Sequence, residues 1–134
     1  MTATEKNSVL SQRIARSLGI HITEAHCNTL RRAELTLSRW AERECGDGSN
    51  WYIQRDEQTG VPYEHYCGGS PNYNPKPRRI PDKEAGALRR AEAIASHYNL
   101  QVFHQGDPRG CLLYIGGSDM TDSNYPTTGV ACHV

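Results

Sequence analysis

The stretch LQVFHQGDPRGCLLYI, residues 100–115, places two short runs rich in apolar residues on either side of a turn sequence. Asp107, Pro108 and Gly110 stand where a type I turn prefers Asp, Pro and Gly. The flanking runs, 100–104 and 111–115, are rich in residues that favour strands. This stretch therefore predicts an antiparallel β-hairpin.

A second hairpin is predicted upstream. The runs WYIQR at 51–55 and VPYEHY at 61–66 enclose the turn-like segment DEQTG at 56–60. Pro62 has no N–H to donate to a sheet, so we expect its strand to lie at an edge. The residues from 129 to 134 could add a short last strand.

Three segments repeat apolar residues at the helical spacing of three or four. They cover residues 9–18, about 23–45 and about 81–98. Gly19 is expected to end the first helix, and Thr23 to cap the start of the second. The charged residues of the second helix, expected mostly on its other faces, are Arg31, Arg32, Glu34, Arg39, Glu42 and Arg43.

The order of these elements predicts an α+β fold. We expect an antiparallel sheet of four to five strands with three amphipathic helices packed on it. The 134 residues suit one domain, 1–134. Within it, residues 1–8 are expected to be flexible, 67–77 to form an exposed loop and 118–134 an irregular tail.

Composition excludes some classes of protein. Lys plus Arg and Asp plus Glu number 15 each, so the formal net charge is zero. This argues against a strongly basic nucleic-acid coat and against mimicry of DNA by charge alone. No apolar run approaches the roughly 20 residues that a membrane span needs, and no signal peptide is evident. We therefore expect no membrane partner and a cytoplasmic location.

Five segments together resemble a family of small uncharacterised accessory proteins of tailed bacteriophages and prophages. The resemblance covers most of the chain from about residue 30. The segments are LSRWAERECGDG at 37–48, WxIxRDExTGxPY at 51–63, RIPDKEAGALR at 79–89, QGDPRGCLLY at 105–114 and TDSNY at 121–125. That family has no agreed catalytic residues, so none is carried over.

The resemblance implies expression inside a bacterium and an accessory role in infection. Small phage proteins of this kind are often inhibitors of host machinery, anti-defence proteins of the anti-CRISPR type included. By analogy, we expect a protein that binds and inhibits a host bacterial protein in the host cytoplasm.

The segment from 76 to 90 is the most basic of the chain and follows a loop rich in Gly, Pro, Asn and Tyr. Arg109 lies at the tip of the predicted 107–110 turn. The candidate binding residues are Tyr73, Lys76, Arg78, Arg79, Arg89, Arg90 and Arg109. The same basic surface would suit nucleic acid, which is the second hypothesis, and a solvated helix face also explains it. Residues 11–30 weakly resemble a helix-turn-helix, with Asn28 where a buried apolar residue is needed.

Cysteine and histidine residues offer two further alternatives. The cysteines are Cys27, Cys45, Cys67, Cys111 and Cys132. Zinc sites favour paired ligands such as Cys-x-x-Cys, and none occurs, although His65 and Cys67 would share one strand face. Free thiols are the preferred reading, and we predict neither metal nor cofactor. A small enzyme using Cys111 with His104 is the least favoured hypothesis, because Cys111 begins the most apolar strand.

Overall fold

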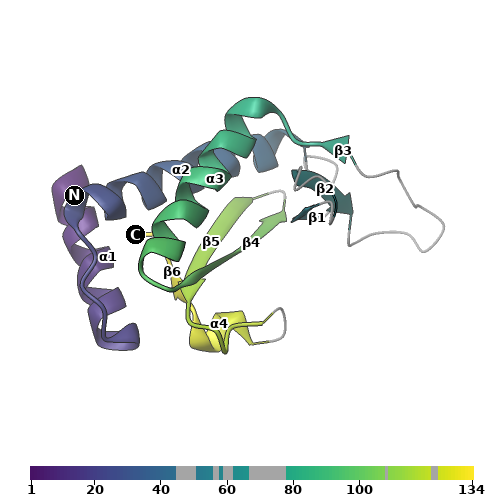
Figure 1. The fold of residues 1–134 in the computed structure, drawn as a ribbon. Helices are drawn as coiled ribbons and strands as arrows, with labels where there is room; N and C mark the ends of the chain where they lie inside the picture. The colour runs from purple at the N-terminus through teal and green to yellow at the C-terminus, as the bar shows by residue number, and fades with distance from the viewer. Residues whose placement is uncertain (45–50, 56–57, 59–61, 67–77, 108, 122–123) are drawn as a thin grey trace.

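The sheet has six strands in the order β3-β2-β1-β4-β5-β6, and neighbouring strands run antiparallel (Figure 1). The structure, a computed structural model, describes residues 1–44, 51–55, 58, 62–66, 78–107, 109–121 and 124–134. The strands are β1 (Trp51–Arg55), β2 (Pro62–Tyr66), β3 (Arg78–Arg79), β4 (Gln101–Asp107), β5 (Gly110–Gly116) and β6 (Val130–Ala131). The helices are α1 (Ala3–Leu18), α2 (Glu24–Glu44), α3 (Asp82–His97) and α4 (Tyr125–Thr128).

Local sequence signals set both ends of α1. The side chain of Thr2 accepts a hydrogen bond from the N–H of Glu5 at 3.1 Å, which caps the first turn. Gly19 ends the helix at φ +69°, and its N–H donates to the carbonyl of Ala15. The end at Gly19 is therefore as predicted. The segment 1–8, expected to be flexible, instead supplies most of the first two turns of α1.

Capping also fixes the ends of α2 and α3. The hydroxyl oxygen of Thr23 accepts from the N–H of His26 at 3.2 Å, which confirms the predicted cap. Asn99 takes a left-handed conformation, φ +57°, after the last turn of α3. The N–H of Asn99 donates to the carbonyl of Ser96, and that of Leu100 donates back to Ala95 at 2.7 Å. This pair of bonds is a Schellman motif, which turns the chain from α3 into β4.

Helices α2 and α3 pack against each other and cover one face of the sheet (Figure 1). Helix α2 lies mainly over β5, and α3 lies over β4. Between the helices and the sheet, the core includes Leu30, Leu37, Leu88, Leu113 and Ile115. An ion pair of 3.6 Å between Arg43 and the buried carboxylate of Glu84 adds a polar link between the two helices.

Helix α1 packs differently from the expected third covering helix. It lies beside α2 and also contacts β6, at the edge of the molecule, whereas α2 and α3 hold the sheet face (Figure 1). The α+β class with an antiparallel sheet is as predicted. The position of α1 on the sheet is a correction.

The hairpin of β4 and β5 forms the centre of the described sheet. Its register pairs Asp107 with Gly110 and continues to Gln101 with Gly116. Both strands are therefore longer than the sequence predicted. Gly110 has φ +124°, a conformation that suits glycine. A Cβ at this position would overlap the side chain of Ser38 on α2, so glycine also permits the close approach of helix and hairpin.

The expected number of strands and the expected tail both need correction. In the described residues six strands stand where four to five were predicted, β3 and β6 contain two residues each, and β2, expected at an edge, lies between β1 and β3. The region 118–134, expected to be irregular, contains the helix α4, whereas β6 agrees with the short last strand expected within 129–134. The predicted exposed loop 67–77 lies outside the described residues. Within the described residues, no helix has the length and apolar character to cross a membrane.

Candidate functional site

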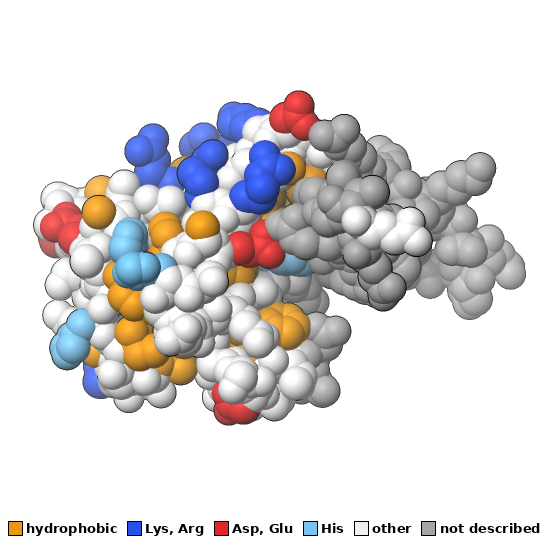
Figure 2. All heavy atoms as spheres, viewed as in Figure 1, with side chains coloured by type: hydrophobic (Ala, Val, Ile, Leu, Met, Phe, Trp, Pro, Cys, Tyr) orange, Lys and Arg blue, Asp and Glu red, His pale blue; other side chains and the backbone are white. Residues whose placement is uncertain are grey.

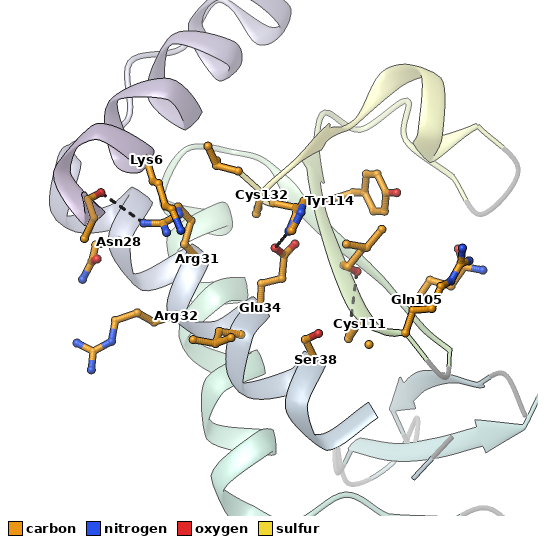
Figure 3. Close-up of a pocket in the computed structure, with 17 residues that line it drawn as sticks. Lys6, Asn28, Arg31, Arg32, Glu34, Ser38, Gln105, Cys111, Tyr114 and Cys132 are labelled. Carbon is orange, nitrogen blue, oxygen red and sulfur yellow. Dashed lines mark hydrogen bonds and ion pairs between the residues drawn. The ribbon is translucent and has the colours of Figure 1, made fainter. Parts of the chain in front are cut away.

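A groove opens beside β5, where the short strand β6 stops pairing with it (Figure 3). Strand β6 pairs only with Tyr114 and Ile115 of β5. The walls of the groove come from α1, α2, the β4–β5 hairpin and residues 132–134, and its volume is about 980 Å³. Four parts of the chain that are distant in sequence therefore meet around one hollow.

Glu34 of α2 lies deep in this groove, with 5% of its surface exposed. Its Oε2 accepts a hydrogen bond from the backbone N–H of Leu113 at 2.8 Å. Its Oε1 lies 3.5 Å from Nδ1 of His133 (Figure 3). A helix side chain thus binds both the backbone of β5 and the segment that follows β6.

Burial raises the pKa of Glu34 from its ordinary 4.5 to about 7. The Leu113 N–H and the positive charges of Arg13 and Arg31 act in the opposite direction, and the loss of hydration outweighs them. Arg13 also donates from Nη1 to the carbonyl oxygen of His133 at 2.7 Å. Near pH 7, Glu34 is therefore divided between its neutral and charged forms.

A polar network joins α1 to α2 along the adjacent wall. Nη1 of Arg31 donates to Oδ1 of Asn7 at 2.7 Å, and Nδ2 of Asn7 donates to Oδ1 of Asn28 at 3.4 Å. Asn7 is only 3% exposed, so these bonds satisfy a buried amide. Asn28, the residue that did not suit a helix-turn-helix, here serves the packing of the two helices.

Exposed leucines face the same groove. In the described part of the chain, the large hydrophobic side chains that stand exposed are Met1, Leu35 and Leu112. Leu35 on α2 is 50% exposed and Leu112 on β5 is 40% exposed, and both line the groove. Its basic lining residues are Lys6, Arg31, Arg32 and Arg109.

The groove does not present a nucleophilic thiol. Cys111 and Cys132 line it, yet each is only 1% exposed. Burial is the main cause that raises the pKa of the Cys132 thiol, and it also raises the pKa of Cys27. In the hairpin, His104 pairs with Leu113 and Cys111 pairs with Gly106, so the two proposed partners stand diagonally. The burial of Cys111 and its diagonal position relative to His104 argue against the Cys111–His104 enzyme.

The predicted binding residues fall in separate places. Arg109 lines the groove, whereas Arg89 and Arg90 are exposed on α3 and are not part of its lining. Arg78 and Arg79 form β3, and Tyr73 and Lys76 lie outside the described residues. The structure therefore does not gather the predicted set into one site.

A basic surface extends over α2 and α3, where Lys and Arg side chains gather in the upper part of the view (Figure 2). The exposed basic residues of these helices are Arg32, Arg39, Arg43, Lys83, Arg89 and Arg90. Arg32 belongs both to this surface and to the groove lining. From the sequence, only the α3 part of this basic surface was predicted, because the basic residues of α2 alternate with acidic ones.

Metal-binding candidates are not assembled in the described part of the chain. Within it, no group of three or more His, Cys, Asp or Glu side chains is placed to hold an ion. His65 belongs to β2, and Cys45 and Cys67 lie outside the described residues. The side chains of Cys27, Cys111 and Cys132 are buried and form no disulfide within the described residues.

The burial of Glu34, the central residue of the groove, was not predicted from the sequence. The signal was its spacing: Glu34 follows Leu30 by four residues and precedes Leu37 by three, so it continues the apolar stripe of α2. A single charged residue within such a stripe indicates a buried polar contact.

Comparison with known proteins adds no relative. No family model matches the chain, and no curated protein or solved structure matches it. The resemblance to phage accessory proteins therefore stays a prediction.

Proposed function

We propose that the chain is a phage accessory protein that binds a host bacterial protein and blocks its action, and that the groove beside β5 is the binding surface. The observation that carries the proposal is the placement of Leu35 and Leu112, both exposed, in one groove. The buried thiols of the groove leave little support for catalysis there.

Exposed leucines beside basic side chains are typical of a surface that another protein covers. Apolar area that a partner removes from water supplies affinity, and the charged rim supplies orientation and specificity. Arg109, expected from sequence to make such a contact, contributes to this rim. Inhibition follows if the bound partner surface is one that the host protein needs.

The first test is capture of a partner from bacterial lysate, with and without nuclease, followed by mass spectrometry. The wild-type chain is expected to retain one host protein in stoichiometric amount after nuclease treatment. Leu35→Asp places a charge in the groove, and it should lower recovery of that protein about tenfold or more. Ala25→Asp is the matched control, because Ala25 is an exposed residue of the same helix outside the groove lining.

Recovery of no protein by the wild-type chain would reject the proposal. Equal recovery of the host protein by Leu35→Asp and Ala25→Asp would show that the contact lies outside the groove. An anti-defence role has its own readout, which is the plating efficiency of a CRISPR-targeted phage on cells that express the chain. Wild type should raise that efficiency, and Leu35→Asp should not.

Nucleic-acid binding is the second candidate, because basic side chains extend over α2 and α3 (Figure 2). Its test is titration of a labelled oligonucleotide at several salt concentrations. Binding through phosphates should weaken steeply with salt and should fail in the Arg89→Glu/Arg90→Glu variant. Salt-independent binding, or binding that this variant retains, would reject it.

A further inference from the structure

The charges lining the groove differ from those of the whole chain. The chain balances 15 basic residues with 15 acidic ones. Among the lining residues are four basic side chains and one acidic side chain, Glu34. Glu34 is buried, and its raised pKa leaves it partly neutral near pH 7. The groove therefore presents a net positive surface on a neutral protein.

The positive side chains of the groove come from three parts of the chain, and two of these parts also carry an exposed leucine. Lys6 belongs to α1, Arg31 and Arg32 belong to α2, and Arg109 follows β4 (Figure 3). Leu35 lies one turn after Arg31 and Arg32 on α2, and Leu112 lies three residues after Arg109. Each wall thus pairs a leucine with an arginine, so a ligand meets apolar and positive groups together.

We propose that the groove binds an acidic, leucine-containing segment of the partner protein. Its carboxylates meet Arg32, Arg109 and Lys6, and its apolar side chain lies between Leu35 and Leu112. This inference rests on the proposed function and specifies the chemistry of the partner.

A segment of protein fits this surface better than a polynucleotide. Phosphates would meet the same cations, yet bases bind mainly through stacking on aromatic rings, and among the described lining residues Tyr114 alone is a Phe, Tyr or Trp, beside two exposed leucines. Leucine side chains instead favour aliphatic contacts, which a leucine in the ligand supplies.

The test is fluorescence anisotropy with labelled peptides and the intact chain. The probe is fluorescein-Asp-Glu-Leu-Glu-Leu-Asp-Glu, compared with a version carrying Ser for each acidic residue and one carrying Ala for each Leu. The probe is expected to bind about tenfold more tightly than the Ser version and about fivefold more tightly than the Ala version. Equal affinity for all three peptides would overturn the inference.

Charge reversal locates the binding. Arg32→Glu/Arg109→Glu should weaken binding of the probe about tenfold or more, and Lys6→Glu alone should weaken it about threefold. Arg89→Glu/Arg90→Glu makes the same change of charge on α3, outside the groove lining, and should retain wild-type affinity. Equal losses in the two double variants would mean attraction by overall charge and would overturn the inference. Circular dichroism and thermal melts confirm that each variant is folded.

Competition separates the two classes of macromolecule. An oligothymidylate of the same charge should displace the probe poorly. Displacement at equal concentration would assign the groove to nucleic acid and overturn the inference. The peptide titration tests the groove chemistry and the lysate capture tests the proposed function, so a negative result in one can be told apart from a negative result in the other. Peptide binding without a captured protein rejects the proposed function, whereas a captured protein that groove variants still bind rejects only the groove chemistry.

Discussion

Leu113 donates its backbone N–H to the carboxylate of Glu34 at 2.8 Å, while its carbonyl accepts from the N–H of Cys132 at 2.9 Å. Leu113 and Cys132 stand one position beyond the last pair of β5 and β6. An antiparallel hydrogen-bonded pair normally exchanges both bonds. Here the side chain of Glu34 takes the place of a strand carbonyl, which ends the β5–β6 ladder and opens the groove.

Titration of Glu34 should make stability depend on pH. Its pKa is about 7 in the folded state and 4.5 for an unperturbed group, so between these values the folded chain holds a proton that the unfolded chain has released. The free energy of unfolding should therefore fall as pH rises from 4.5 to 7, by up to about 3 kcal/mol from this group. Urea denaturation across this range measures the change.

Glu34→Gln isolates that contribution. Gln keeps an oxygen for the Leu113 N–H but does not titrate, so the variant should match wild type near pH 4 and be more stable at pH 8. Glu34→Ala, which leaves the N–H without this acceptor, should lose about 1–3 kcal/mol at pH 4. The same pH slope in wild type and Glu34→Gln would show that another group is responsible.

Asn7→Ala should destabilise the packing of α1 on α2. Asn7 is buried and exchanges hydrogen bonds with Arg31 and Asn28, and Ala at this position would remove both bonds from the interface. We expect a loss of about 1–3 kcal/mol in the free energy of unfolding, measured with urea. Ser8→Ala changes an exposed neighbour and should have little effect. Equal effects of the two changes would contradict the role of Asn7.

Gly110→Ala should destabilise the hairpin for two reasons. The residue has φ +124°, and the new Cβ would overlap the Ser38 side chain. A loss of about 2–4 kcal/mol is expected, and Ser38→Ala should restore part of it by removing the hydroxyl. Gly19→Ala, at φ +69° with nothing within 4 Å of its Cβ, should cost about 1 kcal/mol. Thermal melts of the four proteins measure these differences, and a Gly110→Ala chain as stable as Gly19→Ala would refute the overlap.

Thr23→Ala should destabilise α2 by about 1 kcal/mol, because the cap on the N–H of His26 is lost. For Thr29→Ala we expect the opposite change, a small gain in the stability of α2. Thr29 lies inside the helix, where its hydroxyl bonds to the carbonyl of Ala25, and Ala has the higher helix propensity. Urea denaturation that finds similar losses for both would argue against a capping role.

The described thiols should react slowly in the native state. Cys27, Cys111 and Cys132 are at most 1% exposed, so a maleimide should modify them at least about a hundredfold more slowly than free cysteine. Peptide mapping by mass spectrometry gives the rate for each site. Rapid modification of Cys111 in the folded chain would support the hypothesis of an enzyme that uses Cys111 with His104.

Short-range signals predicted much of the fold. Gly19, Thr23 and the 107–110 turn act through their own neighbours, so sequence sufficed to place them. The start of α1 was missed because Asn7 interrupts the apolar stripe, and its burial depends on Arg31 in another helix. Propensity cannot anticipate a contact of this kind.

The candidate site was largely hidden from sequence reasoning. Arg109 was identified, because a turn exposes its side chain. Leu112 belongs to an apolar run that predicts a buried strand, and the short pairing of β6 leaves this part of the sheet open. Leu35 lies off the apolar stripe of α2, and the sequence does not show that it shares a groove with Leu112. The presence of Lys6 and Arg109 in the lining of the same groove depends on how α1 packs, which no local pattern encodes.

The hydrogen bond from Arg13 to the carbonyl of His133 joins residues 120 positions apart. Contacts of such separation close late in folding, because the intervening chain must first be ordered. On a translating ribosome, the groove cannot exist until residues 132–134 have left the exit tunnel. A nascent chain that has not yet reached these residues therefore lacks the complete groove.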